Sequence, residues 1–272
     1  MRAALNDKEN PDLASNLRLR MAEVAEPRQL SALLLADLGD QLRLVKRPDD
    51  AIRHYRTILT WYPRSLLKDR AYAGLGLIAL TQGESKQALD YFALFEKESF
   101  QSPLLAQVLR AKADLYLAQG KKDEAIRELE RILEVKSAKG RPWVEALYQI
   151  GEIRMGQKDP KRAIPYFQRI YVLYARWSDM VAKAYWQSGQ AFEQLGMTQE
   201  ALNTYKEFTG QPHLQETAEF SKALDRLKKR GTHESLPDHS FPADAAPAHP
   251  AGRPGGPEQR SGHAGRDPRH GR

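Results

Sequence analysis

The chain has 272 residues, of which 41% are hydrophobic and 28% are charged, so most of it is expected to fold as a soluble protein with a sizeable core. It contains no cysteine, which excludes disulfides and thiolate metal sites. The net charge of +7 keeps nucleic acid and acidic surfaces among the possible partners. No apolar run reaches the roughly 20 residues that cross a bilayer, and the N-terminus lacks the apolar core of a secretory signal. A cytoplasmic location is the default expectation, with the cell envelope open if the N-terminus is truncated.

Residues 1–29 are predicted to hold one helix, in the segment "PDLASNLRLRMAEVAEP". Its apolar residues recur at three- and four-residue steps, which is typical of a helix with one buried face. We expect this face to contact the rest of the fold through Leu13, Leu17, Met21 and Val24. The helix is interpreted either as an N-terminal cap or as the remnant of a lost repeat.

Residues 30–214 are predicted to be helical throughout and to repeat. A small residue is followed twelve positions later by alanine, and four positions after that by an aromatic residue or leucine. The alanines are 37 or 38 residues apart, and the five copies read Gly39–Ala51–Tyr55, Gly76–Ala88–Phe92, Ala113–Ala125–Leu129, Gly151–Ala163–Phe167 and Gly189–Ala201–Tyr205. Such a period indicates stacked helical hairpins.

The small residues are expected where the two helices of a hairpin cross closely, and the larger residues are expected between successive hairpins. Gly83, Gly120 and Gly196 are predicted to close first helices in a left-handed conformation. Asp159 is predicted to cap a second helix that begins at Pro160.

The segment "QIGEIRMGQKDPKR" superficially matches a phosphate-binding loop. Lys158 is displaced by one position, no Ser or Thr follows it, and no strand precedes the segment. Gly151 and Gly156 are therefore interpreted as residues that pack and end a helix. No nucleotide or other cofactor is expected.

Residues 215–230 are predicted to form an amphipathic capping helix with Phe220, Leu224 and Leu227 on its apolar stripe. Residues 231–272 are rich in Pro, Gly, Ala and His and are predicted to be a disordered tail, because they hold almost no large apolar residue. Metal capture by the five tail histidines is the minor alternative, and no metal site is predicted.

The repeated pattern over roughly residues 30–210 resembles the tetratricopeptide repeat (TPR), a helix-turn-helix unit with a basic period of about 34 residues. The resemblance implies an all-α fold, a right-handed α-solenoid of about five TPR-like hairpins whose first helices line a concave groove. The style of the repeats is similar to bacterial TPR proteins of the cell envelope.

The resemblance also implies which positions face that groove. The groove-facing residues on which we base the site are Ala73, Leu77, Leu80, Arg110, Asp114, Tyr148, Glu152, Trp186 and Gln190, and Asp40 occupies the corresponding position of the first copy. Some chaperone-binding TPR domains hold a peptide carboxylate with a Lys and Asn pair. Here the two positions read Ala36/Asp40, Ala73/Leu77, Arg110/Asp114, Tyr148/Glu152 and Trp186/Gln190, so that function is not expected.

The sequence thus favours a non-catalytic scaffold that binds a peptide or partner protein in the groove, with Trp186 and Tyr148 as anchors. These two side chains have an equal claim to simple packing between helices. His54 and His213 are the only histidines before the tail, and no set of nucleophile and base emerges, so no catalytic residue is predicted. The alternatives are a basic adaptor for nucleic acid or an acidic membrane surface, and a regulatory subunit of a larger enzyme complex.

Overall fold

The computed structural model describes residues 11–99 and 101–231, and these fold into twelve α-helices with no β-strand among them. The chain divides into two units, residues 1–233 and 234–272, and every described residue belongs to the first. The predictions for the C-terminal tail and its histidines therefore lie outside the described residues, except that Gly231 ends the last helix. No helix in the described part is long and apolar enough to span a bilayer.

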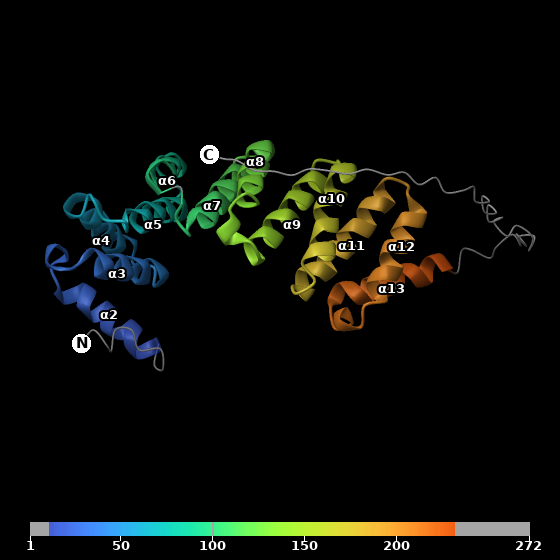
Figure 1. Cartoon of the computed structure of the whole chain (residues 1–272), viewed down its shortest axis with the longest axis horizontal. Coiled ribbons are helices and arrows are strands. Elements are labelled where there is room, and N and C mark those ends of the chain that lie inside the picture. The colour runs from blue at the N-terminus through green and yellow to red at the C-terminus, as the bar shows by residue number, and fades with distance from the viewer. Residues whose placement is uncertain (1–10, 100, 232–272) are drawn as a thin grey trace, which may run out of the picture. The chain divides into compact units, whose positions relative to one another are not determined.

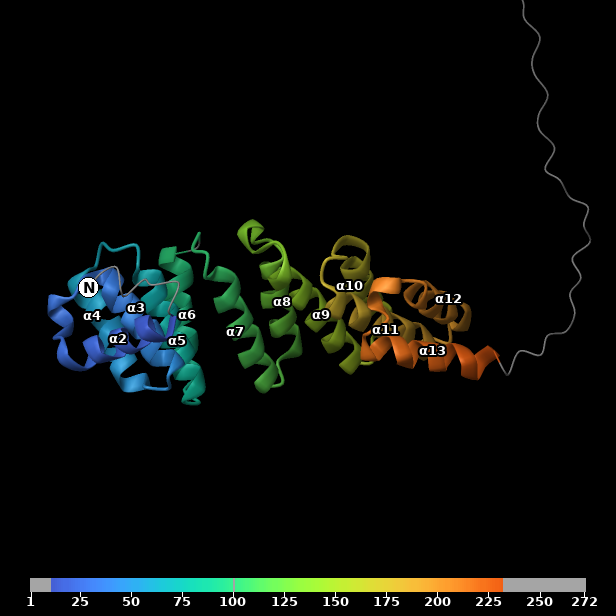
Figure 2. The same cartoon turned by 90° about the horizontal axis from the view of Figure 1, so that it is seen from below.

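Ten of the helices form five hairpins, in which each first helix packs on the second helix that follows it (Figures 1 and 2). The first helices are α3 (Ala32–Leu44), α5 (Lys68–Thr81), α7 (Leu105–Ala118), α9 (Arg141–Gly156) and α11 (Ser178–Gln194). The second helices are α4 (Pro48–Trp61), α6 (Ser85–Ser99), α8 (Lys122–Ile132), α10 (Pro160–Leu173) and α12 (Thr198–Thr209). The prediction of an all-α solenoid of five helical hairpins is confirmed.

Inside four hairpins, the glycine of the first helix lies against the aromatic ring sixteen residues later. A Cβ atom added to Gly39 would come within 2.6 Å of the ring of Tyr55, and one on Gly151 within 2.5 Å of the ring of Phe167. Gly76 with Phe92 and Gly189 with Tyr205 form the same contact. The ring thus fills a notch in its own hairpin, which the sequence analysis did not predict. The ring of Tyr55 also lies against Gly74 of the next hairpin, which is the contact between hairpins that was predicted.

The third hairpin has Ala113 and Leu129 at the two positions of this contact, and both are fully buried. Leucine is smaller than an aromatic ring and reaches less far from its backbone, which leaves room for a methyl group on the facing helix. Size is therefore matched across each hairpin, with glycine opposite a ring and alanine opposite leucine.

The turns between paired helices share one backbone conformation. Gly83, Gly120 and Gly196 have φ values of +79°, +75° and +72°, as predicted. Lys46 and Lys158 occupy the same turn position in the first and fourth hairpins, with φ values of +61° and +60°. In each turn the next residue donates its N–H to a carbonyl five residues earlier, for example Asp159 N to Arg154 O at 2.9 Å. Asp159 then accepts from Arg162 N and caps α10.

The N-terminal helix α2 (Pro11–Val24) is joined to the first hairpin by the 3-10 turn η1 (Pro27–Gln29). Ala22 is buried, and Leu19, Met21 and Ala25 pack around the first core cluster. Val24 is 84% exposed, so its predicted contact with the array is wrong. The helix ends at this residue, and the buried stripe passes through Ala22 on the adjacent face. The side chain of Leu13 lies outside the described residues.

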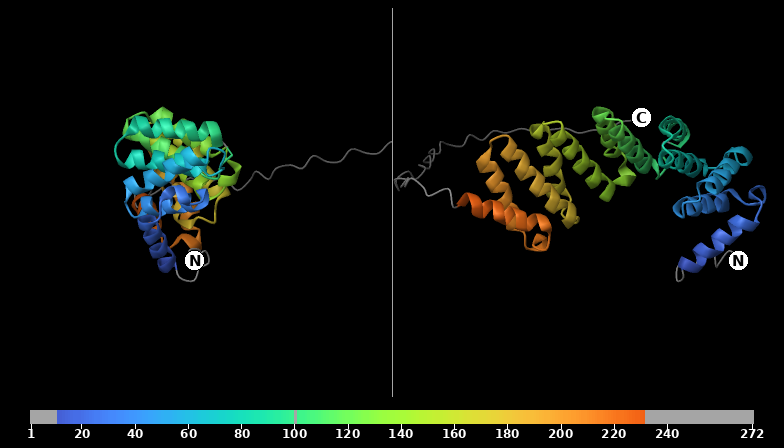
Figure 3. Two further views of the ribbon diagram at one scale, coloured as in Figure 1. Left: turned by 90° about the vertical axis from the view of Figure 1, so that its left-hand side faces the viewer. Right: turned by 180° about the vertical axis from the view of Figure 1, so that it is seen from behind.

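The last helix α13 (Ala218–Gly231) follows the 3-10 turn η3 (Pro212–Leu214) and packs on α11 and α12, at the orange-to-red end of the chain in Figure 3. Phe220 and Ala223 are buried, and Leu227 packs against the same cluster. The predicted stripe was right at Phe220 and Leu227 and wrong at Leu224, which is 36% exposed, because the buried face runs through Ala223 instead.

A closed set of ion pairs joins three helices in the middle of the chain. Lys112 of α7 contacts Glu96 of α6 at 2.6 Å and Glu128 of α8 at 2.8 Å, and Arg131 contacts the same two carboxylates at 2.5 and 2.6 Å. Burial lowers the pKa of Lys112, but hydrogen bonds to Glu128 and Glu96 outweigh it and leave that pKa raised. The four charges cancel, which is how proteins usually accommodate partly buried ions.

Candidate partner-binding face

The predicted site residues lie on the first helices of the second to fifth hairpins. Among the first helices, α3 contacts α5, α5 contacts α7, and α9 contacts α11, while α7 and α9 are joined by the hydrogen bond from Gln149 to Asp114. They therefore form one layer, and their outward side chains make up a shared surface, which we call the first-helix face. Three of the predicted residues, Leu77, Arg110 and Asp114, come together on this face.

These three residues line a hollow of about 490 Å³ between α5, α7 and the start of α9, which we call the central hollow. Its floor is apolar and its rim is charged. The lining residues are Leu77, Pro103, Ala106, Gln107, Arg110, Ala111, Asp114, Ile132, Ser137, Ala138, Pro142 and Glu145. A volume of this size takes a few amino-acid side chains.

The hollow lies beside the end of α8. This helix spans 11 residues, against 12 to 15 for the other second helices, and ends at Ile132. The chain then makes the 3-10 turn η2 (Lys136–Ala138) before α9 begins at Arg141. Ser137 and Ala138 of this turn form one wall, and Trp143 fixes the turn by donating its indole N–H to Val135 O at 3.1 Å.

The rim of the central hollow is a loose polar network. Arg110 Nε lies 3.4 Å from Asp114 Oδ1, and its Nη1 lies 4.0 Å from Glu145 Oε2. Gln149 donates to Asp114 at 3.0 Å, and Arg141 contacts Glu145 at 2.8 Å. Asp114 and Glu145 keep 54% and 41% of their side chains exposed. Exposed pairs of this kind are weak, so a ligand group can replace them at small cost.

Other predicted positions contribute less surface. Ala73 is 3% exposed and belongs to the core around Phe92, so it offers a partner no contact and its prediction as a groove residue is corrected. Leu80 is half-buried against the same cluster. Asp40 accepts hydrogen bonds from Tyr55 and Arg70, both at 2.5 Å, and is therefore part of the framework.

The aromatic positions of α9 and α11 are half-buried. Tyr148 lies 5.7 Å from Phe167, and Trp186 lies 5.5 Å from Tyr205, both measured between ring centroids. Each ring therefore packs on the notch-filling ring of its own hairpin and keeps one edge outward. Tyr148 and Trp186 therefore pack between helices and still keep part of their surface available to a partner.

Polar and charged residues lie near the rings of Tyr148 and Trp186. Burial raises the pKa of Tyr148 to about 12, and the neighbouring Glu152 carboxylate contributes to the rise. Lys222 of α13 places its Nζ 6.0 Å from the centre of the Trp186 ring. Lys222 was missed from the sequence, since only the fold brings α13 against α11. Glu152 is exposed and Gln190 is half-buried.

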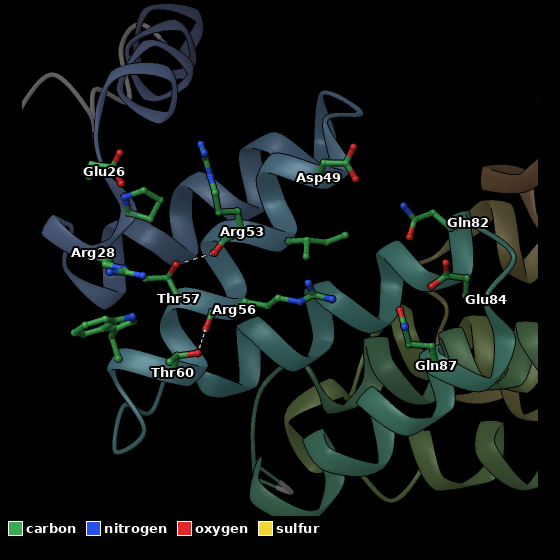
Figure 4. A pocket seen from close by; sticks show the side chains of 13 residues that line it. Glu26, Arg28, Asp49, Arg53, Arg56, Thr57, Thr60, Gln82, Glu84 and Gln87 are labelled. Carbon is green, nitrogen blue, oxygen red and sulfur yellow. Dashed lines mark hydrogen bonds between the residues drawn. The ribbon is translucent and has the colours of Figure 1, made fainter.

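A second hollow, of about 1040 Å³, lies beside α4 and is lined by η1, α4 and the turn before α6 (Figure 4). Arg28, Arg53 and Arg56 face it together with Glu26, Asp49 and Glu84. The labelled side chains point in different directions, and the charges of the two signs balance. None of the predicted groove residues lines it.

In a chain without cysteine, a metal site would have to be built from His, Asp and Glu side chains. Within residues 11–99 and 101–231, no group of three or more His, Asp or Glu side chains is arranged to hold a metal ion. His54 is fully buried and bonds through Nδ1 to Asp50 O at 2.8 Å, while His213 is exposed in η3.

Comparison with known families decides the assignment of the repeats. Models described as tetratricopeptide repeats match residues 110–180 and 183–211, which cover the third, fourth and fifth hairpins. The chain contains tetratricopeptide repeats. Members of this family are generally non-catalytic scaffolds for protein–protein interaction, and this TPR chain has the architecture of such a scaffold.

Solved structures of other TPR proteins share the fold. The C-terminal part of a TPR repeat-containing protein from Cytophaga hutchinsonii aligns with a TM-score of 0.58 at 16% identity, covering 79% of this chain and 81% of that one. YrrB, described as a TPR protein with an unusual peptide-binding site, gives 0.52 at 16% identity, covering 79% and 100%. MamA gives 0.50 at 20% identity, covering 76% and 97%. No curated protein sequence matches the chain.

Proposed function

We propose that this TPR protein is a non-catalytic scaffold that holds a peptide segment of a partner protein along its first-helix face. The observation that carries the proposal is the central hollow, where an apolar floor meets a rim of exposed, weakly paired charges. Peptide grooves combine these two elements, since apolar pockets supply affinity and a few polar groups fix the orientation of the peptide.

The shape of the hollow suggests the chemistry of the segment. Leu77, Ala106 and Ala111 offer an apolar surface for one or two aliphatic side chains. Asp114 and Glu145 on the rim favour a cationic side chain beside them, and Arg110 favours a backbone carbonyl or a carboxylate. A peptide that leaves the hollow toward α11 would reach Tyr148 and Trp186, which serve as a second anchor.

YrrB supports the plausibility of this use, because it has the same fold and is described as having a peptide-binding site. The rival function is a basic adaptor for nucleic acid or an acidic membrane surface. The two differ in salt dependence, because phosphate contacts weaken steeply as salt rises whereas apolar anchoring does not.

The proposal is tested by panning a random 12-residue peptide library against the full chain and titrating an enriched peptide at 0.1 and 0.5 M salt. Arg110→Glu and Leu77→Ser are expected to weaken binding about tenfold or more, and Trp186→Ala and Tyr148→Ala to weaken it several-fold. Arg127→Glu, on the outer surface of α8, is the matched control and should leave binding unchanged. Retention of the peptide by all four groove variants would overturn the proposal.

A further inference from the structure

The outer surface of α10 differs from that of the other second helices. Its exposed residues follow one another at helical spacing, beginning with the cations Lys161 and Arg162 and ending with the apolar pair Val172 and Leu173. Arg169 and Pro165 lie between these ends. Val172 and Leu173 are 68% and 63% exposed, so this surface ends in an apolar pair.

The cationic part of this surface borders a hollow of about 780 Å³, which we call the α10 hollow. Its lining residues are Arg154, Asp159, Lys161, Arg162, Pro165, Tyr166 and Arg169, so four cations face one carboxylate. Lys161 and Arg169 form no ion pair within the described part of the chain, and Arg162 is 71% exposed with a 3.4 Å contact to Asp159. Arg154 contacts Asp123 at 3.6 Å, so Lys161 and Arg169 are the two cations of the hollow whose charge is uncompensated.

The placement of Lys161 and Arg162 costs stability. They stand in the first turn of α10, where the helix dipole favours acidic side chains. The same register positions hold Asp49 and Asp50 in α4, and Asp123 and Glu124 in α8. The first turn of α6 also lacks acidic residues, with Lys86 and Gln87 at these positions. Among the second helices only α10 places two cations there, which points to a functional constraint in this repeat.

We propose that the α10 hollow and the apolar end of α10 bind a short acidic segment of a second protein partner, separate from the peptide of the first-helix face. Two or three carboxylates of the segment would pair with Lys161, Arg162 and Arg169. One aliphatic side chain would cover Val172 and Leu173, about 16–18 Å along the helix from Lys161. Pro165 and Tyr166 supply the surface between them.

A polyanion fits this surface less well. Tyr166 donates its hydroxyl to Glu130 of α8 at 2.9 Å, and Arg154 lies 3.6 Å from Asp123 of α8. The cations are thus bordered by carboxylates on the α8 side. Nucleic acid carries a charge about every 1.7 Å along its axis and would meet these carboxylates, whereas a short peptide fits between them.

The test pans a 12-residue phage library against the full chain, with counter-selection on the double variant Lys161→Glu/Arg162→Glu. Enriched peptides are expected to carry at least two Asp or Glu residues and one aliphatic residue. A synthetic enriched peptide should lose about tenfold in affinity for the double variant and for Arg169→Glu, and several-fold for Leu173→Ser. Because the effect is partly electrostatic, 0.5 M salt should weaken binding.

Two controls separate this site from the fold and from the first-helix face. The double variant should melt no lower than the wild type, since acidic residues suit a helix first turn. Lys86→Glu/Gln87→Glu changes the same register positions of α6 and should not affect binding, and neither should Trp186→Ala. Enriched peptides without acidic residues, or affinity unchanged in the double variant, would overturn the proposal. Tighter binding of a 30-residue oligo(dT), or self-association abolished by the double variant, would also overturn it in favour of nucleic acid or a second copy of the chain.

Discussion

Gly76 of α5 lies against the ring of Phe92 of α6, and the methyl group of alanine at position 76 would overlap that ring. The contact recurs in three other hairpins, while the third replaces both partners, with Ala113 opposite Leu129. The pair of sizes, rather than either residue alone, is therefore what each hairpin requires.

Gly76→Ala is expected to lower the free energy of unfolding by about 1–3 kcal/mol, because it overpacks a buried contact. Adding Phe92→Leu creates the pair seen in the third hairpin and should recover most of that loss, giving a favourable coupling of about 1 kcal/mol or more. Urea unfolding followed by circular dichroism measures both effects. The matched reversal, Ala113→Gly with Leu129→Phe, should be tolerated, and strictly additive effects would contradict the size match.

Lys46→Gly and Lys158→Gly are each expected to stabilise the protein by up to about 1 kcal/mol. Both lysines hold φ values near +60°, a conformation that costs a side-chain-bearing residue more than glycine. The gain is reduced by the greater freedom of glycine in the unfolded chain. Thermal melts of the two variants give the result, and Gly120→Lys, the opposite change at the same turn position, should destabilise.

Burial lowers the pKa of His54 below its ordinary value near 6.5. Between the folded and unfolded pKa values, the unfolded chain binds the extra proton, so the free energy of unfolding falls as the pH drops below about 6.5. His54→Gln should flatten this part of the pH profile. Denaturant titrations from pH 7.5 to 5 measure the slope, and a slope unchanged by His54→Gln would contradict this account.

Lys112→Met is expected to cost about 2–4 kcal/mol, because it leaves Glu96 and Glu128 facing one another with only Arg131 between them. Both the Lys112 and Glu128 side chains are 12% exposed, so water replaces the lost cation poorly. Arg127→Ala breaks the exposed pair with Glu124 in the same region and should change stability by less than about 0.5 kcal/mol. Equal effects of the two substitutions would contradict this account.

The hairpins could be predicted because their determinants are local. The spacing from Gly39 to Tyr55 and the glycine at each turn are properties of one hairpin, so they can be read without knowledge of its neighbours. The ends of the array were harder to predict. Val24 lies two residues from buried Ala22, Leu224 lies one residue from buried Ala223, and only the packing partner selects between adjacent faces.

The central hollow was predicted in part. Leu77, Arg110 and Asp114 follow from the repeat register, but Ser137, Ala138 and Glu145 depend on where α8 stops and how η2 turns. The conformation of Lys158 was also missed, although its position 38 residues before Gly196 was a usable signal. A rule based on glycine cannot identify a turn that holds lysine.

Each aromatic ring closes a notch within its own hairpin, and this has a consequence for how the chain can change in length. A cut between corresponding residues of neighbouring hairpins, such as Tyr55 and Phe92, removes one period and leaves every remaining glycine with the ring it was matched to. Insertion or loss of 37 or 38 residues therefore keeps each small residue opposite its matched partner. Insertion or loss of one residue between the two members of a pair would move them out of contact in that hairpin.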